Sequence, residues 1–171
     1  MRLILSTILL AAGLYSVFAD EDKVGKYNIG FAAGFTTGYG LSYRQWFDNG
    51  YGMQFSCGPY YDKNSDATDV SLSLGVAGLK MIHSARRINL FGYYGTHLHY
   101  SYFKQNNIFD LYANSASITE DWNLFTGGGA GLDFHVGIIS LSVMTGLMLS
   151  SDFKNNYHFG ITAETALYYS F

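Results

Sequence analysis

Charged residues are scarce in this sequence, and so are proline, cysteine and long apolar runs. Only 13% of the 171 residues are charged, whereas a soluble domain carries about 25%. A single proline together with 18% aromatic residues is the opposite of what a disordered chain contains. The formal net charge of −3 excludes a basic, nucleic-acid-binding surface. These shortages indicate a folded chain whose surface is not built for water alone.

The N-terminus predicts export. Met1-Arg2 is followed by an apolar run over 3–17, which is too short for a membrane-spanning helix, and then by Val17-Phe18-Ala19. This pattern is typical of a signal peptide over 1–19 with cleavage after Ala19, the alternative being a retained anchor helix. The mature chain, 20–171, is then one domain by length. Cys57 is the only cysteine, so an intrachain disulfide framework is excluded.

The mature part alternates in polarity with a period of two residues, which is typical of strands with two different faces. The last segment is the clearest example, since Phe159, Ile161 and Leu167 share one face whereas Gly160 and Glu164 share the other. The sequence predicts eight such strands, at 26–35, 39–47, 51–61, 69–82, 88–103, 121–135, 138–149 and 157–171.

The fourth of these segments is the least regular. Its apolar positions change phase near Ala77-Gly78, which predicts a β-bulge at the glycine.

Connections between the predicted strands alternate in length. The tight ones are 48–50, 83–87 and 136–137, the longer polar ones are 62–68, 104–120 and 150–156, and Thr36-Thr37-Gly38 is a compact exception on the side of the longer loops. Short turns at one end and longer loops at the other are typical of outer-membrane barrels.

The loop over 104–120 also carries an apolar cluster, with Phe103, Ile108, Phe109, Leu111 and Tyr112, which marks either a binding surface or a cover over the barrel mouth.

Two all-β alternatives remain, a soluble calycin-like binding barrel with an apolar interior and a membrane barrel with an apolar exterior. The polar face consists largely of Gly, Ala, Ser and Asn, which offers too little charge for a soluble exterior but fits the crowded interior of eight strands. Gly127, Gly129 and Gly131 lie on this face, and the run Gly127-Gly128-Gly129 is expected to permit barrel curvature. Aromatic residues at both ends of the apolar face match the two interfacial girdles of a membrane barrel. We therefore predict an eight-stranded antiparallel up-and-down transmembrane β-barrel.

The C-terminus carries the alternating residues Leu167, Tyr169 and a terminal Phe171. They resemble the closing-strand signal read by the outer-membrane barrel assembly machinery. With the signal peptide and the eight segments, the whole chain resembles the small outer-membrane β-barrel proteins of the OmpA/OmpX-like class. The resemblance implies insertion into the cell outer membrane by that machinery, contact with outer-membrane lipid, and external loops that face an extracellular ligand or host partner.

Charged residues on the polar face are expected in the lumen, where buried charges need partners. These candidates are Arg44, Lys80, Asp133 and Glu164. One hypothesis pairs Glu164 with Arg44 or Lys80 so that the pair closes the lumen, and the other leaves each group facing trapped water.

His97 and His99 are further interior candidates, on one face of the fifth strand with Ser101. The His-x-Ser pattern resembles part of the motif of outer-membrane lipid A deacylases, but Tyr102 replaces the asparagine of that motif. The partner acid would be either Glu120 or Asp121.

Alternation moreover points these histidines into the barrel, so we expect a polar interior layer rather than an enzyme. Two histidines at i, i+2 lack a third ligand, so neither a metal nor a cofactor is expected.

Three functions follow in order of preference. The first is a structural or surface-interaction protein acting through its external loops. The second is a narrow channel, which the small lumen of eight strands disfavours. The third is a lipid-modifying enzyme.

Overall fold

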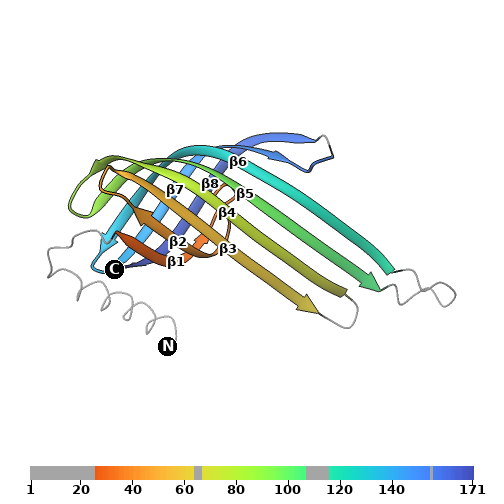
Figure 1. The fold of residues 1–171 in the computed structure, drawn as a ribbon. Coiled ribbons are helices and arrows are strands. Elements are labelled where there is room, and N and C mark those ends of the chain that lie inside the picture. The colour runs from red at the N-terminus through yellow and green to blue at the C-terminus, as the bar shows by residue number, and fades with distance from the viewer. Residues whose placement is uncertain (1–25, 64–66, 107–115, 155) are drawn as a thin grey trace, which may run out of the picture.

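The computed structural model describes residues 26–171 except 64–66, 107–115 and 155, and consists of eight β-strands (Figure 1). The strands are β1 (Tyr27–Ala33), β2 (Gly40–Trp46), β3 (Tyr51–Lys63), β4 (Ala67–Ser84), β5 (Ile88–Asn106), β6 (Ala116–Val136), β7 (Ile139–Ser151) and β8 (Tyr157–Ser170). The predicted signal peptide over 1–19 lies outside the described residues. In the part of the chain that is described, no helix has both the length and the apolar character needed to cross a membrane.

Each strand pairs antiparallel with the next, and β1 also pairs with β8, so the sheet closes into a barrel. At this seam Asn28 lies opposite Ser170, and the backbone N–H of Phe171 donates to the carbonyl of Tyr27 at 2.9 Å. The rings of Tyr27 and Phe171 stack beside it with centroids 6.0 Å apart. The predicted fold class, eight antiparallel up-and-down strands in a closed ring, is confirmed.

The strands differ greatly in length. β1 and β2 have 7 residues each, whereas β5 and β6 have 19 and 21. Figure 1 shows the long strands running well past the short pair at one end of the barrel. The first strand is shorter than the predicted 26–35 because the chain leaves the sheet after Ala33. The predicted loop over 104–120 contributes strand at both ends, and its residues 107–115 are not described.

The two faces of the sheet separate by polarity as predicted. Outward-facing apolar side chains occur on every strand. They include Ile29, Phe31, Leu41, Phe55, Val76, Ile88, Trp122, Leu141, Leu147, Phe159, Ile161 and Leu167. Along β7 this apolar face runs from Ile139 to Leu149, ten steps that project to ~25 Å of height at ~3.3 Å per residue and ~40° tilt.

The interior is not built from small residues alone. Trp46, Leu79, Phe91 and Met144 form a buried apolar cluster with Ala77 and Tyr93. This cluster explains an error in the predicted phase of β4. Leu79 points inward to join it, so the inward alternation of Ser73, Gly75 and Ala77 continues without a break. No bulge lies at Gly78, and the register shift of β4 against β5 falls instead between Met81 and His83.

Candidate functional site in the barrel interior

Arg44 occupies the interior near the level of the Trp46 cluster, and its side chain is only 1% exposed. β2 contributes Arg44 and β6 contributes Asp133, two strands that are not neighbours in the sheet. Their side chains meet across the lumen, with Nη1 of Arg44 2.8 Å from Oδ1 of Asp133. The ion pair therefore spans the barrel.

The remaining donors of Arg44 also have partners. Nε and Nη2 donate to Oε1 of Gln54 at 3.1 and 2.7 Å, and Nη1 donates to Oγ of Ser142 at 2.8 Å. Ser142 in turn donates to Asp133. The guanidinium carbon lies 4.5 Å from the centroid of the Tyr168 ring and 5.2 Å from that of Phe91. The guanidinium group is held by these contacts on several sides, so it closes the lumen at this level. We call Arg44, Gln54, Asp133, Ser142 and Tyr168 the arginine layer.

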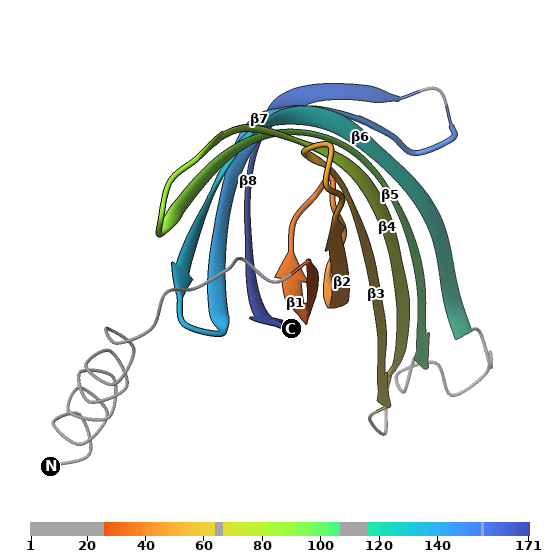
Figure 2. The same cartoon turned by 60° about the vertical axis from the view of Figure 1, so that its left-hand side comes forward.

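The connection between β1 and β2 closes the lumen at a second level. In Figure 2 this connection lies beneath the arch of the longer strands. Thr36 and Thr37 are 0% and 1% exposed, so the turn points into the barrel instead of outward into solvent. Gly38 has φ of 79°, a left-handed conformation that favours glycine and lets the chain reverse inside the lumen. We call residues 34–39 the inward turn.

Glu164 of β8 holds the inward turn in place. Thr36 and Thr37 donate their backbone N–H groups to the two carboxylate oxygens, at 3.0 Å to Oε1 and 3.2 Å to Oε2. Their hydroxyl groups donate to the same two oxygens, and Thr162 adds a hydroxyl donor to Oε1 at 2.9 Å. Because hydrogen bonds to an ionised group are roughly twice as strong as neutral ones, this carboxylate acts as the main anchor of the turn.

Glycines on the surrounding strands leave the space that the turn occupies. A Cβ atom added to Gly75 of β4 would meet the carbonyl of Thr37, and one added to Gly95 of β5 would lie 2.7 Å from the carbonyl oxygen of Thr36. At Gly127 of β6 it would lie 3.0 Å from Cγ2 of Thr36. The glycines of the polar face therefore make room for an internal segment, a role that alternation alone did not indicate.

Two sequence-based predictions about the charges are wrong. Lys80 is exposed on the outside of β4, where its Nζ lies 3.7 Å from the centroid of the Tyr51 ring, because the strand keeps its phase through Gly78. Glu164 pairs with neither Arg44 nor Lys80, because Arg44 is matched by Asp133 and the threonines of the inward turn satisfy Glu164. Alternation identifies the face of a residue but not its height in the barrel.

Sequence reasoning missed Thr36, Thr37, Gln54, Ser142 and Tyr168 as members of the interior network. All five carried a usable signal, since Gln54, Ser142 and Tyr168 stand on inward positions and Thr36-Thr37 belongs to an unusually short connection at the end of the longer loops.

The two predicted histidines lie beside the inward turn. His97 is 3% exposed, and its Nε2 is 2.8 Å from Oγ of Ser73 while its Nδ1 is 3.0 Å from the carbonyl oxygen of Phe35. His99 is half-buried, with Nδ1 3.1 Å from the hydroxyl of Tyr39.

Of the two acids considered as catalytic partners, Asp121 lies directly opposite Ser101 in the register of β5 and β6, whereas Glu120 lies opposite Tyr102. Glu120 is exposed, and Asp121 forms an exposed ion pair with Lys154, with Oδ1 2.7 Å from Nζ. The carboxylate of Asp121 is thus engaged by Lys154, and the ring nitrogens of His97 and His99 contact Ser73, Phe35 and Tyr39 instead of Ser101. Within the described ranges, no group of three or more His, Cys, Asp or Glu side chains could hold a metal ion.

Charges at the end of β7 stabilise the connection to β8. The ion pair with Asp121 raises the pKa of Lys154. Asp152 accepts hydrogen bonds from the side-chain amide of Asn156 at 2.6 Å and from the backbone N–H of Lys154 at 2.8 Å, and these bonds lower its pKa.

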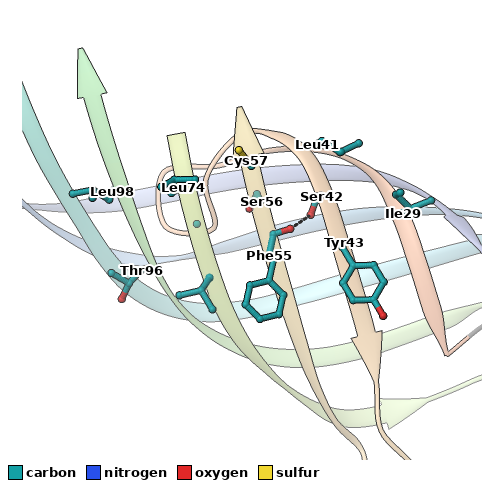
Figure 3. A pocket seen from close by; sticks show the side chains of 12 residues that line it. Ile29, Leu41, Ser42, Tyr43, Phe55, Ser56, Cys57, Leu74, Thr96 and Leu98 are labelled. Carbon is teal, nitrogen blue, oxygen red and sulfur yellow. Dashed lines mark hydrogen bonds between the residues drawn. The ribbon is translucent and has the colours of Figure 1, made fainter. Parts of the chain in front are cut away.

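The exterior carries an apolar groove of about 550 Å³ over β1 to β5 (Figure 3). Ile29, Leu41, Phe55, Leu74 and Leu98 line it, and Cys57 lies exposed among them. At the other side of the seam, Leu167, Tyr169 and Phe171 face outward with 53%, 50% and 62% of their surface exposed. These features continue the apolar exterior around the barrel.

Comparison with known proteins supports the architecture. Neither a protein-family model nor a curated sequence matches the chain. Among solved structures, a major outer membrane protein from Thermus thermophilus is similar over 87% of this chain and 100% of its own, with 13% identity and a TM-score of 0.53.

Ail, the attachment invasion locus protein of Yersinia pestis, covers the same shares at 18% identity with a TM-score of 0.48. With the closed ring of eight antiparallel strands, the similarity to the Thermus protein shows that this chain has the fold of the small outer-membrane β-barrels.

Proposed function

We propose that the chain is an outer-membrane β-barrel with a structural or surface-interaction role, and not a channel. The observation that carries this proposal is the division of the sheet into two faces. The exterior is apolar, and the interior is closed at two levels, by the arginine layer and by the inward turn. The apolar height of ~25 Å along β7 fits the hydrocarbon band of such barrels. A soluble calycin-like barrel would instead carry its polar side chains outside.

The surface role rests on the unequal strands. β3 to β6 extend beyond the ends of β1 and β2, so they raise one side of the rim above the apolar belt. The rings of Tyr100 and Trp122 lie there with centroids 4.6 Å apart and planes tilted by 44°, and Trp122 is 46% exposed. An extracellular ligand or host partner would meet this raised rim together with the loops at its tips.

The biogenesis of the protein belongs to the same proposal. Residues 1–19 act as a signal peptide, residues 20–171 form the barrel, and Leu167, Tyr169 and Phe171 are read by the assembly machinery. Outer-membrane lipid then covers the apolar exterior.

The test combines heat-modifiability with conductance. The full-length coding sequence is expressed in a Gram-negative host, and the protein is extracted from the outer-membrane fraction. Unheated and boiled samples are compared by SDS gel, and the protein is then inserted into planar bilayers. We expect a shift between the two bands and no discrete current steps. A protein recovered in the soluble fraction without a shift would overturn the membrane assignment, and regular steps of current would restore the channel.

A further inference from the structure

The wall of the barrel has a gap between β1 and β8, in the half of the barrel that contains the inward turn. β1 ends at Ala33 opposite Thr165, but β8 continues to Tyr157, so residues 157–164 have no strand beside them on that side. Likewise β2 pairs with β3 only as far as Cys57. The side chains at this edge are correspondingly bare, with Phe159 73% and Ile161 78% exposed. The inward turn lies behind the gap, since it takes the chain into the lumen where longer strands would have filled the wall.

A pocket of about 350 Å³ lies at this gap. Its lining combines outward-facing and inward-facing residues, namely Ala33, Gly34, Phe35, Tyr39, His97, His99, Phe125 and Ala163. Ala33 and Ala163 stand on the lipid-facing side of β1 and β8, whereas the two histidines come from the interior face of β5. The pocket therefore connects the apolar exterior with the barrel interior, and its size lies within the ~300–1,000 Å³ of small-molecule sites.

Aromatic rings form most of the pocket wall. The ring centroids of Phe35 and Phe125 are 5.8 Å apart, and His97 stacks on Phe125 at 5.4 Å. Tyr39 lies 5.8 Å from the rings of both His97 and His99. Such a wall offers a broad apolar contact to a ligand.

One polar atom of the wall is left for a ligand. Both ring nitrogens of His97 are engaged, by Ser73 and by the carbonyl of Phe35. In His99 only Nδ1 has a partner among the described residues, the hydroxyl of Tyr39. When that hydroxyl donates to Nδ1, the proton of the ring resides on Nε2, which becomes a donor. The pocket thus offers a largely aromatic wall and, at His99, a hydrogen-bond donor that no described residue engages.

The height of the opening restricts what can reach it. Ala163 lies eight residues from Phe171 along β8, which projects to ~20 Å at ~3.3 Å per residue and ~40° tilt. Phe159, which faces outward on the same strand, lies four residues farther from Phe171, so the opening is ~10 Å below the outer end of the apolar belt, at the depth of lipid acyl chains. Molecules from the membrane are closer to it than solutes from water.

We propose that this pocket binds the unbranched acyl chain of a membrane-derived amphiphile, which enters sideways between Phe35 and Ala163. This proposal rests on the proposed membrane location. The rings of Phe35 and Phe125 contact the chain, and Nε2 of His99 donates to a carboxylate or ester oxygen at its polar end. A free fatty acid and the tail of a membrane lipid share this chemistry.

Photolabelling tests the proposal. The extracted full-chain protein is reconstituted into nanodiscs with a trace of diazirine-bearing palmitic acid, irradiated and mapped by mass spectrometry. We expect saturable labelling of peptides that contain Phe35, His99 and Phe125. Ala163→Trp, which fills the opening, should lower this labelling at least tenfold. Ala130→Trp, also an exposed outward alanine but on β6, should leave it unchanged.

Competition by unlabelled ligands identifies the source of the acyl chain. Displacement by unlabelled palmitate alone supports a free fatty acid, and displacement by lysophospholipid supports a lipid tail. Labelling that neither competes away nor responds to Ala163→Trp overturns the proposal.

A second variant keeps the test decisive. If Ala163→Trp fails to fold and gives no heat-shifted band, the variant His99→Leu takes its place. We expect His99→Leu to weaken the competition by unlabelled palmitate several-fold. Unchanged competition in the His99→Leu variant contradicts the proposed donor. Heat-modifiability of the same wild-type samples reports on the barrel itself, so failure of the pocket is distinguishable from failure of the membrane assignment.

Discussion

Arg44 and Asp133 illustrate how a buried charge is tolerated in a barrel of this size. Each of the two side chains is 1% exposed, and each has hydrogen-bond partners besides the other. Removing two charges from water is costly, and their mutual attraction offsets this cost only when the geometry and the additional hydrogen bonds are good. The intact pair therefore contributes little net stability, whereas the loss of one partner destabilises the protein.

Loss of one partner of this pair should be far more harmful than loss of both. We expect Arg44→Ala to lower the free energy of unfolding by about 3–5 kcal/mol, because it leaves an uncompensated carboxylate. The double variant Arg44→Met with Asp133→Leu should regain most of that loss. Urea unfolding in lipid vesicles, followed by the fluorescence of Trp46 and Trp122, measures both.

Lys154→Met serves as the control for this comparison. It breaks the exposed ion pair with Asp121. Exposed pairs contribute little to stability, so no measurable change is expected. A double variant as unstable as Arg44→Ala would show that the interior requires the ion pair itself.

At the scale of elements, the inward turn is the least expected part of the molecule. Seven residues in each of β1 and β2 are enough to close the seam, and the chain between them becomes part of the interior. The turn depends on space left by β4, β5 and β6 and on an anchor from β8. Four separate strands thus determine the position of one short connection.

Two glycines of β4 allow a direct test of the space argument. Gly75 faces the turn, and a Cβ there would meet the backbone of Thr37 and lie 3.0 Å from Cα of Gly38. Gly78 faces outward, with nothing within 4 Å of a Cβ. We expect Gly75→Ala to lower the temperature at which the compact gel band is lost, and Gly78→Ala to leave it unchanged. Equal effects of the two substitutions would mean that the turn does not need the space at Gly75.

The anchor can be tested by chemical accessibility. In a Cys57→Ser background, a Thr37→Cys thiol should resist a water-soluble maleimide while the turn is held inside. Adding Glu164→Ala removes the acceptor of the turn's N–H groups, and we expect the thiol to react at least tenfold faster. Glu120→Ala removes an exposed carboxylate of the same type and should have no effect. Slow labelling in the Glu164 variant would show that packing alone retains the turn.

Much of the strand arrangement could be predicted from the sequence. Period-two alternation predicted all eight strands and their two faces, because lipid and lumen impose different chemistry on successive residues. Alternation misplaced Lys80 because it assumed that the apolar neighbour Leu79 faces lipid. Leu79 instead belongs to an interior apolar cluster, so Lys80 faces outward.

The partners of Arg44 and Glu164 could not be predicted for a different reason. They depend on the stagger of strands that are distant in sequence, and alternation does not encode the stagger. The inward course of Thr36 and Thr37 depends in the same way on a residue more than 120 positions later.

At the scale of the whole molecule, the arginine layer and the inward turn fill the interior at two levels, inside an apolar exterior with a raised rim. The seam between β1 and β8 completes the barrel, and Phe171 lies at its lower end against Tyr27. This residue has two separable roles, a contact within the folded protein and the proposed signal for assembly.

Substituting Phe171 should separate these two roles. We expect Phe171→Ala to reduce the amount of heat-modifiable protein in the outer membrane several-fold while refolding from urea into detergent stays close to wild type. Phe159→Ala is a matched control, because Phe159 is also an exposed, outward-facing phenylalanine, in the strand β8 that Phe171 directly follows. Equal losses for the two variants in cells would argue against a signal at the C-terminus.

The position of Glu164 on the last strand has a consequence for the order of folding. Its hydrogen bond to Thr36 joins residues 128 positions apart, and the seam joins Asn28 to Ser170 over 142 positions. Contacts of such separation form late, since the entropy of closing the intervening chain is lost before they contribute. The inward turn is made early in synthesis but acquires its anchor only when β8 arrives, so the barrel encloses its own plug in the same event that pairs β1 with β8.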